Sequence, residues 1–450
     1  MLESFPRDVR APALSNIISA LSFALDLTEG QPLGHAVRTC VIGTRLGSKL
    51  GLSPQEIADL YYALLLKDSG CSNNAARISQ ILGSDDRRAK RDMRSTDWSR
   101  MSGESFAYLR RNLMPERSLF HRAAAVMKML VQGKKQTAEL FSLKCERGAG
   151  IARQLGFSEQ TATAIYSMDE HWDGSGYPHG LKRDRIPSIS RIINLAQTLD
   201  LFVSIHGVPI AFEVVRRRSG SWFDPELVCI LRELENDGAL WESLLGDGRA
   251  RQLAIELEPP QDLVPASHTS LDDICNAFAE VVDAKSPYTF QHSTRVADTS
   301  VAVAGRLGLP QETIAMIRRA ALLHDIGKLS IPNTILDKPA GLTPREWEIV
   351  RLHPYYTQRI LEKIDGFQEL AFVASTHHER LDGSGYFRNL VGEHLPLPCR
   401  VVAVADVFDA LSSSRPYREG LPPETALREI SSRVPHALDL TCFEALKAAI

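Results

Sequence analysis

Apolar residues recur at the spacing of an α-helix along most of this chain. They lie three and four positions apart, whereas the strict alternation typical of half-buried strands is scarce. In the second half of the chain, helices are predicted over 292–307, 312–323, 344–364, 368–379 and 400–413. The pattern therefore predicts an all-α protein.

Local signals also mark where two of the helices begin. The tetrapeptides Ser-Pro-Gln-Glu at 53–56 and Thr-Pro-Arg-Glu at 343–346 each offer a hydroxyl N-cap, a proline at the first helical position and a glutamate for a capping box. The same signal thus stands once in each half of the chain, which invites a comparison of the two halves.

The second half repeats the first. With a shift of 257 positions the halves align without a gap for about forty residues, so that His292 falls on His35 and Asp325 on Asp68. Further along the shift becomes 209 positions, and Asp-Gly-Ser-Gly-Tyr at 382–386 falls on the same five residues at 173–177. The chain is therefore predicted to be an internal duplication of one helical module.

The change of shift indicates an insertion of 48 residues in the first copy, at about 71–137. Within it, 85–111 mixes arginines with acidic residues, which favours a solvated helix or loop over a nucleic-acid patch. A proline-rich stretch at 257–268 is the expected linker. We expect a first domain at 15–256, with a regulatory or dimerisation role, and a second domain at 269–450 that carries the chemistry.

The bulk composition is that of an ordinary globular protein. The 450 residues exceed one typical domain and suggest two or three. A formal net charge of -3 gives no global attraction for polymeric nucleic acid or an anionic membrane. The seven cysteines include no Cys-x-x-Cys pair, and no apolar run reaches the roughly 18 to 20 residues needed to span a bilayer. A cytoplasmic location is the simplest setting.

Residue types that bind transition metals gather in the second copy. The candidate ligands are His292, His324, Asp325, His353, His377, His378 and Asp406. Imidazoles with carboxylates suit one or two divalent cations such as Mn, Fe, Co or Zn better than Mg or Ca. A lone histidine on an apolar helix is usually an ordinary core or surface residue, but five beside two aspartates in one module indicate a metal-dependent hydrolase.

The first copy has lost most of these residue types. His35 and Asp68 are retained, but the other ligand positions are occupied by Lys67, Lys144, Met168, Asp169 and Gln197. A protonated lysine cannot bind a metal ion, and two lysines near Asp68 and Asp169 would supply positive charge where the cations would sit. The first copy is therefore expected to be metal-free and inactive.

Five segments of the second copy resemble the HD-GYP subgroup of the HD-domain phosphohydrolases. They are His-Asp-Ile-Gly-Lys at 324–328, His-Pro at 353–354, His-His-Glu-Arg-Leu-Asp-Gly-Ser-Gly-Tyr at 377–386, and Asp-Val-Phe-Asp-Ala-Leu at 406–411 with Arg-Pro-Tyr-Arg at 415–418. The resemblance covers almost the whole second copy. It implies HD-type helical bundles in tandem, a centre of two or three metal ions, and hydrolysis of the bacterial messenger cyclic di-GMP to the linear dinucleotide or GMP.

The resemblance also assigns roles to residues. It implies one metal ion held by His292, His324, Asp325 and Asp406, and another held by His353, His377 and His378, with Asp325 as the bridge. Fe or Mn is expected, with Zn, Co or Ni as alternatives. Asp325 and Lys328 are the expected catalytic residues, because the Lys328 ammonium can stabilise phosphoryl oxygens.

Several residues have an ordinary structural explanation beside the functional one. Lys328 either contacts the phosphoryl group or ends a solvated helix, and Arg415 either clamps a phosphate or caps a helix. Tyr386 either contacts the substrate or packs in the core. Asp409 either orients a metal ligand or Arg415, or is a surface carboxylate. The sequence leaves these alternatives open.

Two departures from the family pattern bear on the site. The family's Gly-Tyr-Pro reads Gly385-Tyr386-Phe387, so this loop lacks the fixed φ of proline. Family members with a third metal carry a glutamate where this chain has Tyr288, so a dinuclear centre is expected. A non-catalytic cyclic di-GMP receptor or scaffold, and a phosphohydrolase for another cyclic dinucleotide or nucleotide, stay open as alternative functions. A homodimer or a protein partner bound through the first domain also stays open.

Overall fold

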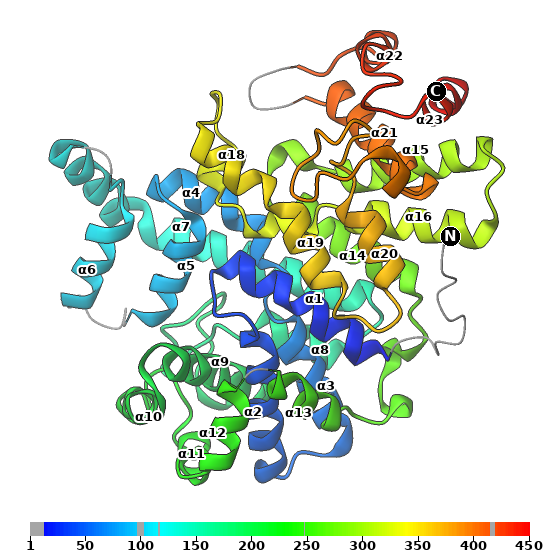
Figure 1. Ribbon diagram of the computed structural model, residues 1–450. Coiled ribbons are helices and arrows are strands. Elements are labelled where there is room, and N and C mark those ends of the chain that lie inside the picture. Colours follow the sequence, from blue (N-terminus) through cyan, green and yellow to red (C-terminus); the bar gives the residue numbers. More distant parts are fainter. Residues whose placement is uncertain (1–12, 97–102, 116–117, 247, 415–418) are drawn as a thin grey trace. The chain divides into compact units, whose positions relative to one another are not determined.

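Helices make up both halves of the protein (Figure 1). The structure, a computed structural model, describes residues 13–96, 103–115, 118–246, 248–414 and 419–450. Within these ranges the only β-structure consists of two isolated bridges, Ser219 with Phe223 and Asp382 with Val391. The prediction of an all-α protein is confirmed. Contacts within the chain define a first unit, Leu14–Thr269, and a second unit, Ser270–Ile450.

The first unit has three helices at its centre, because α2 (His35–Leu50) packs against α3 (Pro54–Leu66) and α9 (Ser188–His206). The predicted capping box opens α3, where Ser53 and Glu56 each bond the backbone N–H of the other. The other α-helices of this unit are α1 (Leu14–Glu29), α4 (Ala75–Leu82), α5 (Asp86–Ser95), α6 (Gly103–Asn112), α7 (Leu119–Gln154), α8 (Glu159–Tyr166), α10 (Val208–Arg217), α11 (Pro225–Leu231), α12 (Gly238–Leu245) and α13 (Arg249–Glu256).

The inserted segment of the first unit has its own small core. Side chains of α4, α5 and α6 and their neighbour Leu113 meet there, with contributions from α7. The prediction of a solvated helix or loop is wrong for α5, which packs against α1, α4 and α9 and buries Asp86, Ala89 and Lys90. Composition misled here because the charges of α5 find buried partners of opposite sign instead of water.

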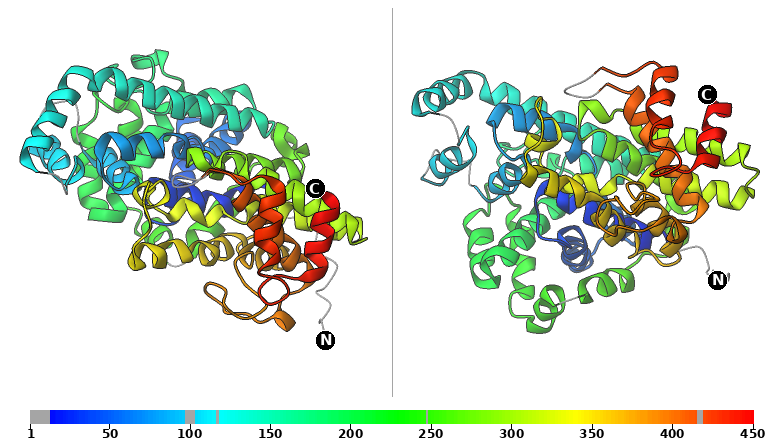
Figure 2. Two further views of the ribbon diagram at one scale, coloured as in Figure 1. Left: turned by 90° about the horizontal axis from the view of Figure 1, so that it is seen from above. Right: turned by 45° about the horizontal axis from the view of Figure 1, so that its top comes forward.

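The second unit repeats the central trio. Here α15 (His292–Arg306) packs against α16 (Gln311–Leu323) and α21 (Leu397–Ser412). The other α-helices are α14 (Leu271–Asp283), α17 (Asn333–Leu336), α18 (Pro344–Arg351), α19 (His353–Leu361), α20 (Gln368–Ser375), α22 (Pro423–Ser431) and α23 (Leu440–Ala449). A long loop, dark yellow to orange in Figure 2, joins α20 to α21.

Two helices of the second unit are shorter than the periodicity predicts. The helix expected at 344–364 is divided into α18 and α19, because Pro354 lacks an N–H and its ring would clash with the carbonyl four residues earlier in a continuous helix. The helix expected at 368–379 ends at Ser375. As a result His353 lies at a helix start, and His377 and His378 lie just beyond a helix end.

Within the described ranges, no helix combines the length and the apolar composition needed to cross a bilayer. All seven cysteines are free thiols, and Cys229 alone among them is exposed.

Candidate metal centre

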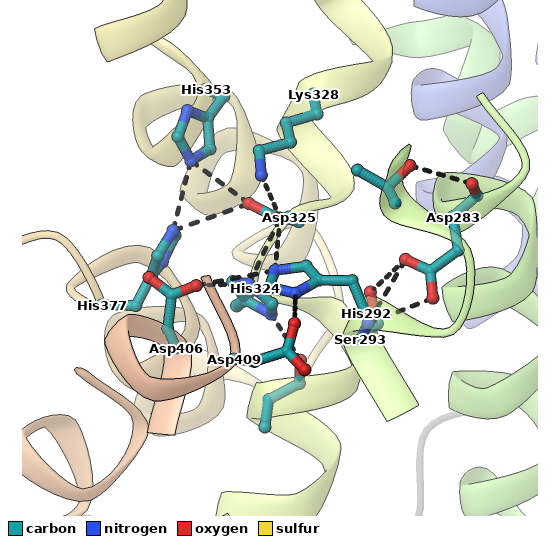
Figure 3. Close-up of polar contacts among 12 residues, drawn as sticks. Asp283, His292, Ser293, His324, Asp325, Lys328, His353, His377, Asp406 and Asp409 are labelled. Atoms are coloured by element: carbon teal, nitrogen blue, oxygen red, sulfur yellow. Dashed lines mark hydrogen bonds and ion pairs between the residues drawn. The ribbon is translucent and has the colours of Figure 1, made fainter. Parts of the chain in front are cut away.

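The seven predicted ligands converge on one pocket of the second unit. They are His292, His324, Asp325, His353, His377, His378 and Asp406 (Figure 3 labels all but His378). Five of them stand at or just beyond helix ends: His292 opens α15, His324 follows α16, His353 opens α19, and the histidine pair follows α20. Helix termini thus bring five of the side chains together, while Asp406 projects from within α21.

Asp325 lies at the centre of the pocket, between two groups of imidazoles (Figure 3). Its Oδ2 lies 3.3 Å from Nε2 of both His292 and His324. Its Oδ1 lies 3.3 Å from Nε2 of His353 and 3.7 Å from Nε2 of His377. The two oxygens of one carboxylate therefore face two different sets of nitrogen atoms, which is the arrangement a bridging ligand needs.

Asp406 completes the pocket from α21. Its Oδ1 lies 3.5 Å from Nε2 of His292 and 3.8 Å from Nε2 of His324, and its Oδ2 lies 3.6 Å from Nδ1 of His378. One group of close ligand atoms comes from His292, His324 and Asp406, and another from the three histidines at 353, 377 and 378.

The outer nitrogen of most of these imidazoles is fixed by the backbone. In His324, His353 and His377, Nδ1 lies 2.6, 2.7 and 2.7 Å from the carbonyl oxygen three residues earlier. A carbonyl oxygen only accepts, so each Nδ1 carries the proton and each Nε2 turns its lone pair toward the pocket. Such outer partners hold metal-binding histidines in the required tautomer.

The charges in the pocket favour a cation. Burial lowers the pKa of His353, His377 and His378, so these imidazoles are neutral and offer lone pairs. Burial would raise the pKa of Asp325, but the neighbouring His324 imidazole and Lys328 ammonium hold it well below its usual range. Burial alone would lower the pKa of His292, but the carboxylates of Asp325 and Asp409 raise it to about 9, so a metal ion at this imidazole would take the place of a proton.

Three buried atoms also lack a hydrogen-bond partner among the described residues, namely Nε2 of His292, Nε2 of His324 and Oδ1 of Asp325. Unpartnered buried polar atoms are costly, and a bound cation would satisfy all three. Imidazole and carboxylate ligands in this number fit divalent transition metals. The residues present therefore fit the metal centre that the sequence predicts.

A close backbone approach holds Asp325 against α19. A Cβ at Gly327 would lie 2.0 Å from the carbonyl oxygen of His353, so only glycine fits at this position. The backbone N–H of Gly327 donates to Oγ1 of Thr357 at 3.1 Å, and Thr357 donates to the carbonyl of His324 at 2.8 Å. The glycine of the His-Asp-Ile-Gly segment thus brings Asp325 beside His353.

Asp409 is buried beside His292 and Arg295, so it is not a surface carboxylate. Its Oδ2 accepts from Nδ1 of His292 at 2.6 Å, while Arg295 donates to both of its oxygens at 2.5 and 3.1 Å. The first unit keeps the same triad in His35, Arg38 and Asp200, with distances of 2.7, 2.7 and 3.0 Å. The triad has survived the loss of the other ligands, so it also supports the packing of the trio of helices.

Changing Asp409 to asparagine should weaken the hold on His292. We expect metal affinity or activity to fall about 10- to 100-fold, the usual cost of losing an outer partner of a metal-binding histidine. Asp200→Asn is the matched control, because it removes the same contacts in the first unit and should leave metal affinity unchanged. Metal titration of both variants checks this. Equal losses of affinity would mean that Asp409 acts only through general stability.

The loop at 376–396 carries Tyr386 over the pocket. The Tyr386 ring lies 4.3 Å from the His378 ring at an interplanar angle of 30°, and the Arg351 guanidinium lies 5.6 Å from the Tyr386 ring. The Lys328 ammonium contacts Oδ2 of Asp325 and is not a solvated helix end. Arg415 lies outside the described residues.

Sequence reasoning gave no role to three further residues near the pocket: Asp283, Arg295 and Glu379. Asp283 accepts from the backbone N–H and the hydroxyl of Ser293 and so anchors the start of α15 (Figure 3). Glu379 accepts from the backbone N–H groups of residues 388 and 390 and so closes the long loop. Each has an identical residue with the same kind of contact in the first unit, namely Asp26, Arg38 and Glu170. Retention in both copies is the signal that would have found them.

In the first unit, lysines stand where the second unit has ligands. Lys67 contacts Asp68, and Nζ of Lys144 lies 2.6 Å from Oδ2 of Asp169. Both lysine side chains are buried. Each remaining carboxylate of this pocket is thus paired with a cation supplied by the chain.

Comparisons with known proteins agree with the duplicated architecture. A family model described as HD domain matches residues 119–227 and 276–441. The chain is 42% identical over 437 residues to the 3′3′-cGAMP-specific phosphodiesterase 3 of Vibrio cholerae, covering 97% of this chain and 94% of that protein. It is 40% identical over 170 residues to the cyclic di-GMP phosphodiesterase response regulator RpfG of Xanthomonas campestris, covering 37% of this chain and 45% of that protein.

A solved structure shares the whole fold. The crystal structure of a cyclic GMP-AMP specific phosphodiesterase of V. cholerae, V-cGAP3, matches with a TM-score of 0.68 and 38% sequence identity. The match covers 98% of this chain and 98% of that one. Both copies of the module therefore lie within the region of similarity.

Proposed function

The chain belongs to the HD-domain family, in its HD-GYP subgroup of phosphohydrolases, and on that premise we propose that it is a metal-dependent phosphodiesterase that hydrolyses cyclic dinucleotides. The observation that carries the proposal is the position of Asp325. Its two oxygens face two sets of imidazole nitrogens in a buried pocket, as a dinuclear centre requires.

The proposed ligand sets follow from these distances. His292, His324, Asp325 and Asp406 would hold one cation, and His353, His377 and His378 the other, with Asp325 shared. Fe or Mn is the proposed metal, with Zn, Co or Ni as alternatives. When bound, such cations lower the pKa of water and neutralise charge on phosphoryl oxygens.

The remaining polar groups of the pocket would bind the substrate. Lys328 supplies an ammonium beside Asp325, where it would stabilise negative charge that develops on the phosphoryl group or the leaving 3′ oxygen. Tyr386 supplies an aromatic face above His378 on which a base would stack. These two residues would orient a phosphodiester whose base lies toward the long loop.

For the substrate, the relative that matches almost the whole chain supports our first choice. The family resemblance implies cyclic di-GMP, and several relatives that match half of the chain or less are named for it. The relative that matches 97% of the chain is named for 3′3′-cGAMP. We therefore take 3′3′-cGAMP as the preferred substrate and cyclic di-GMP as the second candidate.

We also propose a division of labour between the two domains. The second domain, at 269–450, would be catalytic, and the first, at 15–256, would be metal-free and regulatory or dimerising. The cationic partners of Asp68 and Asp169 support this division, because each of these carboxylates is already paired with a cationic side chain.

A turnover assay tests the function. Protein purified without oxygen and loaded with Fe²⁺ or Mn²⁺ should convert 3′3′-cGAMP to its linear dinucleotide, detected by mass spectrometry, and should act more slowly on cyclic di-GMP and cyclic di-AMP. Tight binding of these dinucleotides without turnover in the presence of either metal would instead indicate that the protein is a receptor. Turnover of nucleotide monoesters alone would overturn the substrate class.

Tyr386→Ala tests the stacking role. Loss of one base stack, about 1 to 3 kcal/mol, should lower kcat/KM by about 5- to 150-fold, mostly through KM. Metal content should stay at the wild-type level. Tyr177→Ala is the matched control, because Tyr177 occupies the same loop position in the first unit and stacks on Phe141 at 4.7 Å. A parallel loss of bound metal in Tyr386→Ala would show that Tyr386 only supports His378.

A further inference from the structure

An arginine from the inserted segment enters the ligand-poor pocket of the first unit. Arg94 lies near the end of α5, and its side chain is 16% exposed. Its Nη2 donates to Oδ1 of Asp68 at 2.8 Å and to Oε2 of Glu29 at 2.9 Å. Its Nη1 donates to Oε1 of Gln197 at 2.6 Å. One guanidinium thus joins side chains from α1, the segment after α3, and α9.

Two of these partners stand at ligand positions of the duplicated module. Asp68 corresponds to Asp325 and Gln197 to Asp406, the two carboxylates that face His292 and His324 in the second unit. We propose that the first unit keeps a cation-binding site, and that Arg94 fills it from within the chain in place of a metal ion. The comparison of this site with a metal site rests on the metal centre proposed for the second unit. The contacts of Arg94 with Asp68, Glu29 and Gln197 are independent of that proposal.

The buried charges around Arg94 are balanced without a metal. The cations are Lys67, Lys90, Arg94 and Lys144, and the carboxylates are Glu29, Asp68, Asp86 and Asp169. Burial would raise the pKa of Glu29, but Lys90 and Arg94 hold it at about 2. A divalent ion added to this set would leave uncompensated positive charge in a buried site, which is strongly unfavourable.

The geometry also shows why an arginine suits this place. A guanidinium is planar, keeps its charge when buried and offers donors in a fixed fork, so it can contact several oxygens at once as a metal ion does. Lys90, one turn earlier on α5, adds contacts to Glu29 and to the carbonyl of Cys71 at 3.2 and 2.9 Å. The insertion therefore links α1 to the body of the first unit and makes that link independent of the metal supply.

Chemical rescue tests the proposal on metal-free, full-length protein. Arg94→Ala removes the guanidinium and leaves the cluster of Glu29, Asp68, Asp86 and Asp169 with one more carboxylate than it has cations. We expect the melting temperature of the first unit to fall by about 6 to 20 °C, and amide exchange in α1 and α5 to accelerate. Guanidinium chloride, at concentrations well below those that unfold proteins, should reverse much of both changes, whereas sodium chloride at equal ionic strength should not.

Two further variants keep the test decisive. Arg91→Ala removes an exposed arginine of the same helix and should change neither readout. If Arg94→Ala does not fold, Arg94→Met combined with Glu29→Gln removes the cation together with one counter-charge and should recover a soluble protein. The proposal is overturned if Arg94→Ala melts like the wild type, or if neither guanidinium nor the Glu29 change offsets its loss. Melting temperature and amide exchange do not depend on turnover. Failure of this proposal can therefore be distinguished from failure of the proposed function.

Discussion

Asp325→Asn should abolish hydrolysis and strip the second unit of its metal. Asparagine has nearly the same shape but no charge, so it could not serve the two proposed cations, whereas the two carboxylate oxygens of Asp325 each face one group of imidazoles. We expect turnover to fall by far more than the roughly 100-fold that loss of an outer partner causes. Metal analysis and a cyclic dinucleotide assay on the purified variant measure both effects.

The first unit supplies a control for this variant. Asp68→Asn changes the corresponding residue, which is paired with Lys67 and Arg94. It should lower thermal stability, because two buried cations lose a partner, while the metal content per folded chain stays unchanged. Asp298→Asn, at an exposed position of α15, should alter neither quantity. Full turnover in Asp325→Asn would refute the proposed centre.

Removal of the metal should be the second large effect. A chelator should eliminate turnover and destabilise the second unit, because Nε2 of His292, Nε2 of His324 and Oδ1 of Asp325 are then buried without partners. For metal at about 1,000 times its dissociation constant the lost stabilisation is about 4 kcal/mol, or about 8 to 16 °C in the melting temperature of a domain of this size. Calorimetry before and after chelation measures the shift.

Two further measurements complete this experiment: recovery after metal is added back, and amide hydrogen exchange of individual helices. Mn²⁺ or Fe²⁺ should restore both activity and melting temperature with about two ions bound per chain. Amide exchange should change in α15, α19 and the segment after α20, and not in α2 or α9, whose pocket is balanced by Lys67 and Arg94. An unchanged melting curve after complete chelation would show that the pocket is stable without cations and would contradict the assignment.

The sequence predicted the ligands of the site because the duplication allowed one half of the chain to be compared with the other. Aligning the two halves shows that His292 is retained as His35 in the first copy, whereas His324 is replaced by Lys67. All seven predicted ligands meet in the second unit. Local signals were equally readable, since the capping boxes at Ser53 and Thr343 depend on residues only three positions apart.

Other features escaped because they depend on residues far apart in the chain. Periodicity predicted one helix across His353. The mixed charges of 85–111 predicted a solvated segment around Arg94, although Arg94 contacts Gln197 more than 100 positions away. Arg295 and Asp283 each have an identical residue in the first copy. The neighbouring sequence does not indicate that Arg295 donates to Asp409 or that Asp283 accepts from Ser293 at the start of α15.

By itself, the sequence determined the helical class, the duplication, the types of ligand and which copy lost them, because these follow from residue identity and short spacing. Only the tertiary structure decided that Asp325 lies between two imidazole groups and that an inserted arginine fills the other pocket. The physical reason is that a charged side chain has no fixed partner along its own helix. Its partner is set by which helices pack together, and that packing is driven mainly by apolar surface that many sequences share.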